Sequence, residues 1–270
     1  MEPSLNSISA SSKEYDVRFY YGFSNKQFAD LYIPKGVGPF PVVIGIHGGW
    51  WKSEYDLSTH SHLCNWFKDN GIAAWNIEYR RVNNKLPAWP YCGEDVMAAI
   101  NYLNQVKKEY NLDINNCCII GFSAGAQLAA WATHRYSSNK NTIKNVIIKK
   151  TISLAGAVDL AKCDELKLGD FAVRKFFGIN KKPSLKLLKQ ACPSKLGMTS
   201  VPIHIIHGLL DTSIPACVSE EYFKKLLSNN SLCKLDILTK ATHFQLIDPN
   251  SLYWPIVSNI VFSTFNVTQK

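Results

Sequence analysis

The stretch Cys117-Cys118-Ile119-Ile120-Gly121-Phe122-Ser123-Ala124-Gly125 decides the fold. It begins with a short apolar run, typical of a strand buried on both faces, and the alanine-rich residues 124–136 that follow favour a helix. Between strand and helix lies a GxSxG pentapeptide, in which Gly121 and Gly125 permit the close packing of a sharp turn. We therefore predict that Ser123 is a catalytic nucleophile; the alternative is a helix N-terminus with an incidental serine.

The rest of the chain alternates apolar strands with amphipathic helices. An antiparallel hairpin is predicted at residues 17–21 and 28–33. Further strands are predicted at 41–46, 72–79, 117–120, 149–154, 203–206 and 234–238, and helices at 57–70, 95–108, 124–136 and 215–227. No internal repeat or linker interrupts this order, so residues 1–270 are predicted to form one α/β domain. Its mostly parallel central sheet would carry helices on both faces, with ligand chemistry at the carboxyl ends of the strands.

A glycine-rich turn, His47-Gly48-Gly49-Trp50, directly follows the strand at 41–46. Glycines there expose backbone N–H groups, which can stabilise the oxyanion of a tetrahedral intermediate. We predict Gly49, Trp50 and Ala124 as donors of this oxyanion hole, with Gly48 shaping the turn. The alternative is an ordinary turn after a strand, and His47 is predicted to be structural.

The chain order nucleophile, acid, histidine restricts the partners of Ser123. Among the later histidines, only His243 lies in a loop beyond a further strand, where an imidazole could approach Ser123. The acid must then lie between them, and Asp211 directly follows the buried strand at 203–206. Asp159 follows the strand at 149–154 and remains the rival.

Charge and hydropathy restrict the partners of the molecule. The net charge of +9 includes a local lysine excess at 162–195, which we interpret as a solvated face, although attraction of an anionic substrate stays open. No apolar stretch approaches the roughly 18 residues of a membrane span, and no phosphate loop or metal-ligand spacing is present. We expect a small-molecule substrate without nucleic-acid or membrane partners, metal or cofactor, and leave the oligomeric state open. Because residues 1–13 lack a secretory signal pattern, we expect a cytoplasmic location.

Four segments together, HGGWW, GFSAGA, HGLLD and ATHF, resemble the esterase and kynurenine formamidase branch of the α/β-hydrolases, over residues 28–253. The resemblance implies a cytosolic, cofactor-free hydrolase that uses Ser123, Asp211, His243 and the loop from His47. It also implies a short cap, formed by an insertion at about 159–200, in which substrate choice varies. Kynurenine formamidases favour histidine where this chain has Phe122 and Gln127, so the pattern is closer to generic esterases.

The function predicted from the sequence is cleavage of small carboxylic esters or N-formyl amides through an acyl-serine intermediate, with N-formylkynurenine as a candidate substrate. Trp51, Phe122 and Phe244 flank the catalytic loops and are predicted to line the substrate pocket, unless these rings are ordinary core. The alternatives are a small-acyl carboxylesterase without formamidase activity and a non-catalytic binding protein on the same scaffold.

Overall fold

The structure is a computed structural model that describes residues 15–83, 86–139 and 143–267. Residues 1–13, on which the prediction about a secretory signal rests, lie outside these ranges. None of the helices in the described ranges is both long enough and apolar enough to cross a membrane.

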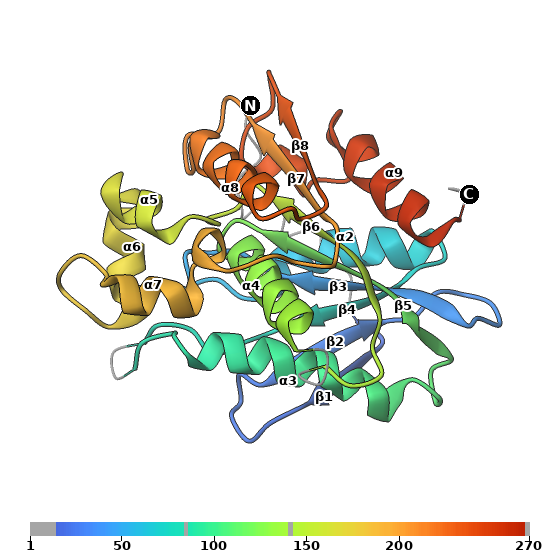
Figure 1. Cartoon of the computed structure of the whole chain (residues 1–270). Helices are drawn as coiled ribbons and strands as arrows, with labels where there is room; N and C mark the ends of the chain where they lie inside the picture. Colours follow the sequence, from blue (N-terminus) through green and yellow to red (C-terminus); the bar gives the residue numbers. More distant parts are fainter. Residues whose placement is uncertain (1–14, 84–85, 140–142, 268–270) are drawn as a thin grey trace.

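A central sheet organises the described residues (Figure 1). Its order is β1-β2-β4-β3-β5-β6-β7-β8, and only β1 with β2 and β2 with β4 pair antiparallel. The strands are β1 (Val17–Tyr20), β2 (Phe28–Tyr32), β3 (Phe40–Ile46), β4 (Ala73–Ile77), β5 (Leu112–Phe122), β6 (Ile148–Leu154), β7 (Ile203–Gly208) and β8 (Cys233–Leu238). This arrangement confirms the predicted mostly parallel sheet, with the predicted hairpin at one edge.

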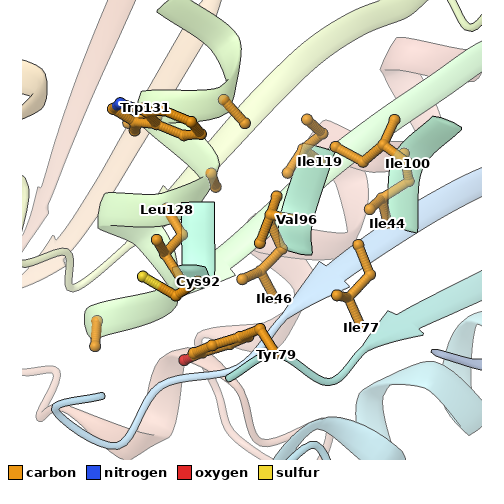
Figure 2. Packing of buried hydrophobic residues seen from close by; sticks show 14 of the residues in the cluster. Ile44, Ile46, Ile77, Tyr79, Cys92, Val96, Ile100, Ile119, Leu128 and Trp131 are labelled. Carbon is orange, nitrogen blue, oxygen red and sulfur yellow. The ribbon is translucent and has the colours of Figure 1, made fainter. Parts of the chain in front are cut away.

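Helices cover both faces of the sheet (Figure 1). On one face lie α3 (Tyr91–Val106), α4 (Ala124–Ser138) and α8 (Cys217–Ser228), and on the other lie α2 (Ser58–Asp69) and α9 (Trp254–Phe265). Each layer buries its own apolar cluster. The cluster under α3 and α4 is shown in Figure 2, where Ile44 and Ile46 of β3 point towards Val96 of α3 and Leu128 of α4.

The insertion at 159–200 folds into three short helices and one 3-10 turn, α5 (Leu160–Glu165), α6 (Leu168–Phe177), α7 (Leu185–Ala191) and η2 (Pro193–Lys195). It packs against the loop after β3, because the ring of Phe176 lies 4.5 Å from that of Trp51. A Cβ placed on Gly169 would lie 2.7 Å from the indole of Trp50. The insertion therefore supports the back of this loop.

The observed boundaries differ from the predicted ones where a neighbouring element supplies the pairing. β5 begins at Leu112 rather than 117, because Leu112 pairs with Phe40 of β3 across a register shift. α3 begins at Tyr91 rather than 95, directly after Trp89 and Pro90. The prediction also lacked α9, whose apolar side packs on the α2 side of the sheet.

Candidate active site

Ser123 occupies a strained turn between β5 and α4. Its backbone has φ 56° and ψ −119°, a left-handed conformation that is unfavourable for a side chain other than glycine. The neighbouring glycines make this turn possible, because a Cβ on Gly121 would lie 2.5 Å from the carbonyl oxygen of Gly125. A Cβ on Gly125 would lie 2.1 Å from the carbonyl oxygen of Ile46. The GxSxG stretch therefore forms the predicted elbow at the carboxyl end of the sheet.

His243 and Asp211 meet at the same end of the sheet, after β8 and β7. The Nδ1–H of His243 donates to Asp211 Oδ2 at 2.5 Å. The other carboxylate oxygen, Oδ1, accepts the backbone N–H groups of Ser213 and Ile214, each at 2.8 Å. Burial by itself raises the pKa of Asp211, but hydrogen bonds from His207 and His243 outweigh it and hold the pKa well below its usual value. Asp211 is therefore an ionised carboxylate that fixes the orientation of His243.

A second histidine supports the same carboxylate. His207 Nε2 donates to the carbonyl oxygen of Ile214 at 2.8 Å and lies 3.3 Å from Asp211 Oδ2. The hydroxyl of Ser219 lies 2.7 Å from His207 Nδ1, which leaves Nε2 to carry the proton. Reasoning from the sequence selected His243 among the later histidines and missed this supporting role of His207. Its position four residues before Asp211, at the end of a strand, was the available signal.

The rival acid, Asp159, has a different task. It is the N-cap of α5, where its Oδ1 accepts the backbone N–H of Lys162 at 3.0 Å. This contact satisfies one of the orphan donors at a helix start. In the structure, His243 therefore pairs with Asp211, and Asp159 caps a helix of the insertion.

A small cavity of about 140 Å³ opens over Ser123 and His243. It is lined by residues of the loop after β3, the start of α2, the elbow and the loops after β7 and β8: Gly48, Gly49, Trp50, Tyr55, Thr59, Phe122, Ser123, Ser213, His243 and Phe244. No hydrogen bond within the described ranges joins the Ser123 hydroxyl to His243, a contact that in resting enzymes often forms only with substrate bound. Nor do these ranges contain three metal-ligating side chains gathered around one point.

The loop after β3 presents free backbone donors to this cavity. The N–H groups of Gly49, Trp50 and Ala124 make no hydrogen bond to any residue that the structure describes. Gly48 permits the close approach, because a Cβ there would lie 2.9 Å from the carbonyl oxygen of Phe122 and 3.0 Å from Ser123 Cβ. Gly49 has φ 110° and Trp50 has φ 53°, so the turn is left-handed at both residues. These features match what an oxyanion hole requires.

Buried contacts of His47 with Tyr79 and Glu78 support this loop on the side away from the cavity. His47 donates through Nδ1 to the carbonyl oxygen of Gly48 at 2.8 Å and stacks on Tyr79 with ring centroids 4.4 Å apart. Its Nε2 lies 3.4 Å from Oε1 of Glu78, which is also 3.1 Å from Arg81 Nη2. Burial by itself raises the pKa of Glu78, but His47 and Arg81 lower it below its usual value. These contacts make His47 a support of the loop.

The aromatic residues predicted for the pocket divide into two groups. Phe122 and Phe244 line the cavity, and the Phe122 ring also packs on His243 at 4.6 Å. Trp51 does not line the cavity, so its prediction as a pocket residue was wrong. Its side chain is fully buried in the core, where the indole N–H donates to Gln127 Oε1 at 3.1 Å. Of the two adjacent tryptophans, only Trp50 lines the cavity.

Three cavity residues were missed by reasoning from the sequence. Tyr55, Thr59 and Ser213 line the cavity but carry no motif, and only the three-dimensional packing brings them to Ser123. The insertion at 159–200 contributes no lining residue to this cavity. Its predicted influence on substrate choice therefore does not extend to the cavity wall.

One family model and several esterases are similar to this chain. The model of the BD-FAE family matches residues 29–226. A probable isoprenylcysteine α-carbonyl methylesterase of rice, Oryza sativa subsp. japonica, is 25% identical over 237 residues, covering 83% of this chain. The match covers 56% of the rice protein, so this chain spans about half the length of that curated relative.

Solved structures of esterases share the fold at low sequence identity. A carbohydrate esterase from gut microbiota superposes with a TM-score of 0.80 at 20% identity, covering 93% of this chain and 97% of the other. Esterase B from Lactobacillus rhamnosis gives a TM-score of 0.81 at 19% identity, covering 97% of this chain and 89% of the other. With these folds and the family match over more than half of its length, the chain belongs to the BD-FAE family and has the α/β-hydrolase fold.

Proposed function

We propose that this protein is a serine hydrolase that cleaves small carboxylic esters through an acyl intermediate on Ser123. One observation carries the proposal: the cavity that contains the strained Ser123 also contains His243, whose other ring nitrogen is held by the ionised Asp211. A serine, a base and an acid in this relation form a nucleophilic triad.

In the first half of the reaction, the Ser123 hydroxyl attacks the ester carbonyl carbon while His243 Nε2 takes its proton. The carbonyl oxygen becomes an anion, which the N–H groups of Gly49, Trp50 and Ala124 stabilise. Collapse of the tetrahedral intermediate breaks the bond to the alcohol, and His243 returns the proton to that leaving oxygen. The products are the free alcohol and an acyl-serine.

In the second half, water replaces the alcohol. His243 accepts a proton from the water, and the resulting hydroxide attacks the acyl carbon, again placing negative charge in the oxyanion hole. When the Ser123 oxygen leaves, it takes the proton from His243, and the acid is released. Asp211 stabilises the imidazolium in both halves without taking the proton itself.

The size and lining of the cavity favour a short acyl group. A volume of about 140 Å³ bounded by Phe122, Phe244 and Tyr55 suits formyl, acetyl or butyryl groups better than a long chain. The aromatic walls would equally accept an N-formylated arylamine such as N-formylkynurenine, which remains the second candidate. The similarity to esterases favours an ester over a formamide substrate, and we propose short-chain esters as the primary substrate class.

Active-site labelling and a substrate series test this proposal. A fluorophosphonate probe should label wild-type protein at Ser123 and fail to label Ser123→Ala. The kcat/KM for p-nitrophenyl acetate should exceed that for the decanoate ester, and N-formylkynurenine is measured in the same series. Absence of labelling in folded protein would favour a binding protein, and a decanoate preference would exclude the small acyl pocket.

A further inference from the structure

A second cavity, of about 300 Å³, lies beside the same loop and plays no part in the proposed reaction. Its lining includes the cationic residues Lys26, Arg80 and Arg81, and among the described residues neither an aspartate nor a glutamate lines it. Cationic side chains around a hollow favour an anion there over a cation. The two acids that pair with the arginines, Asp95 and Glu78, are fully buried behind the cavity wall.

The cations retain hydrogen-bond donors that the protein does not use. Arg80 binds Asp95 through Nε and Nη2, so its Nη1 has no partner among the described residues. Arg81 is only 5% exposed, and Nη2 contacts Glu78 at 3.1 Å, yet neither Nη1 nor Nη2 has a hydrogen bond of good geometry in the part of the chain that the structure describes. Buried donors without an acceptor are costly, so an acceptor arriving from the cavity would be favourable.

The remaining wall suits an organic anion. Tyr91 lies under the Arg80 guanidinium, with 4.9 Å between Arg80 Cζ and the ring centroid, and Pro87 adds apolar surface beside it. On the other side, Ser53 contributes an exposed hydroxyl. Cationic donors next to a flat apolar wall match a carboxylate or phosphate carried on a small carbon skeleton.

We propose that this cavity is a binding site for a small carboxylate- or phosphate-bearing molecule. Its occupant would contact the loop that forms the oxyanion hole, because Ser53 follows Trp50 by three residues. It would also contact Arg81, which is ion-paired with Glu78. Glu78 in turn lies 3.4 Å from His47 at the base of that loop. The anionic group is either a remote part of the ester substrate or a free effector.

Calorimetry with inorganic phosphate tests the site without reference to catalysis, and it is run on wild-type and Ser123→Ala protein. Titration at constant ionic strength, with chloride as the compensating anion, should show saturable binding to both. Lys26→Met should weaken phosphate binding by about fivefold, and Ser53→Asp should abolish it, because a carboxylate at the rim repels the anion. Lys186→Met, which removes an exposed lysine in α7, should bind phosphate as the wild type does.

The variants must keep the wild-type circular dichroism spectrum and thermal midpoint in the absence of phosphate. The absence of saturable binding to wild type, or equal binding by Lys26→Met, Ser53→Asp and Lys186→Met, would overturn the proposal. Kinetics then separate the two sources of the anion. If the site holds part of the substrate, phosphate raises KM only for an ester that bears a carboxylate; if it holds an effector, phosphate changes kcat for p-nitrophenyl acetate as well.

Discussion

The hydroxyl of Ser123 is the group on which the proposed reaction depends. Ser123→Ala removes the only covalent route, so we expect kcat for p-nitrophenyl acetate to fall by at least about 10³-fold. The side chain makes no hydrogen bond to another described residue, and its loss should leave the unfolding midpoint nearly unchanged. Stopped-flow detection of the p-nitrophenolate burst measures the acyl-enzyme directly. A mutant that retains the burst would move the nucleophile elsewhere.

The acid can be identified by a matched pair of substitutions. Asp211→Asn should lower kcat by about 10⁴-fold, because an amide facing Nδ1 favours the wrong tautomer of His243. Asp159→Asn should change kcat little, since asparagine caps a helix about as well as aspartate. Steady-state kinetics of both variants with one short ester suffice, and the opposite ranking would assign the acid to Asp159.

At this scale the sequence predicted which residues the structure brings together at the elbow, but not their surroundings. Ser123, His243 and Asp211 could be found because each lies within five residues of the end of a recognisable strand. Trp50 and Trp51 have adjacent positions and the same side chain, yet one lines the cavity and the other is core. The three-dimensional path of the loop decides which tryptophan lines the cavity, and no sequence period predicts it.

The turn from β5 into α4 depends on the absence of a side chain at Gly125. Gly125→Ala places a Cβ 2.1 Å from the carbonyl oxygen of Ile46 and 2.3 Å from that of His47, and neither backbone atom can move without shifting β3. We expect a loss of about 3 kcal/mol or more in the free energy of unfolding, measured by urea denaturation. Gly197→Ala, where a Cβ meets no atom within 4 Å, is the control and should be nearly neutral. Equal stability of the two variants would contradict the close packing at the elbow.

The loop after β3 can be tested at Gly49. Proline cannot adopt the φ of 110° and removes the N–H donor, so Gly49→Pro should lower kcat by about 10²-fold or more. The labelling of Ser123 by a fluorophosphonate should slow as well, because attack on the phosphorus also places negative charge on an oxygen in the oxyanion hole. Normal turnover would exclude Gly49 from the oxyanion hole.

The ends of helices and strands could be predicted where the spacing of apolar residues changes along the sequence. They could not be predicted where pairing with a distant strand extends a strand. The start of β5 at Leu112 depends on Phe40, which lies more than 70 residues earlier in the chain. The helix α9 was missed because its apolar residues fall in short runs, and a short apolar run does not distinguish strand from helix.

The whole molecule should lose stability in mild acid because it buries neutral histidines. Burial lowers the pKa of His62 and of His134 to about 4 and also lowers that of His60. In the unfolded chain these side chains bind protons near pH 6.5, so protonation favours unfolding as the pH falls from 6.5 towards 4. His62 and His134 should each lower the free energy of unfolding by about 2 kcal/mol between pH 7 and pH 5.

Urea denaturation at a series of pH values measures this effect, and His134→Leu provides the comparison. The variant should show a shallower decline of the free energy of unfolding between pH 7 and pH 5. The ionised Asp211 acts in a lower range, because its stabilising contribution is lost only as the pH falls below the usual carboxyl pKa of about 4. An unchanged slope in His134→Leu would show that this histidine is not neutral in the folded protein.

The left-handed backbone at Ser123 has an evolutionary consequence. Glycine would adopt φ 56° without the strain, on the order of 1 kcal/mol, that serine bears there. A lineage released from selection for hydrolysis would therefore gain stability by drifting from serine to glycine at this one position. Later destabilising substitutions could accumulate in that lineage, and restoring the serine would then lower the free energy of unfolding further. In such lineages the loss of catalysis would be difficult to reverse.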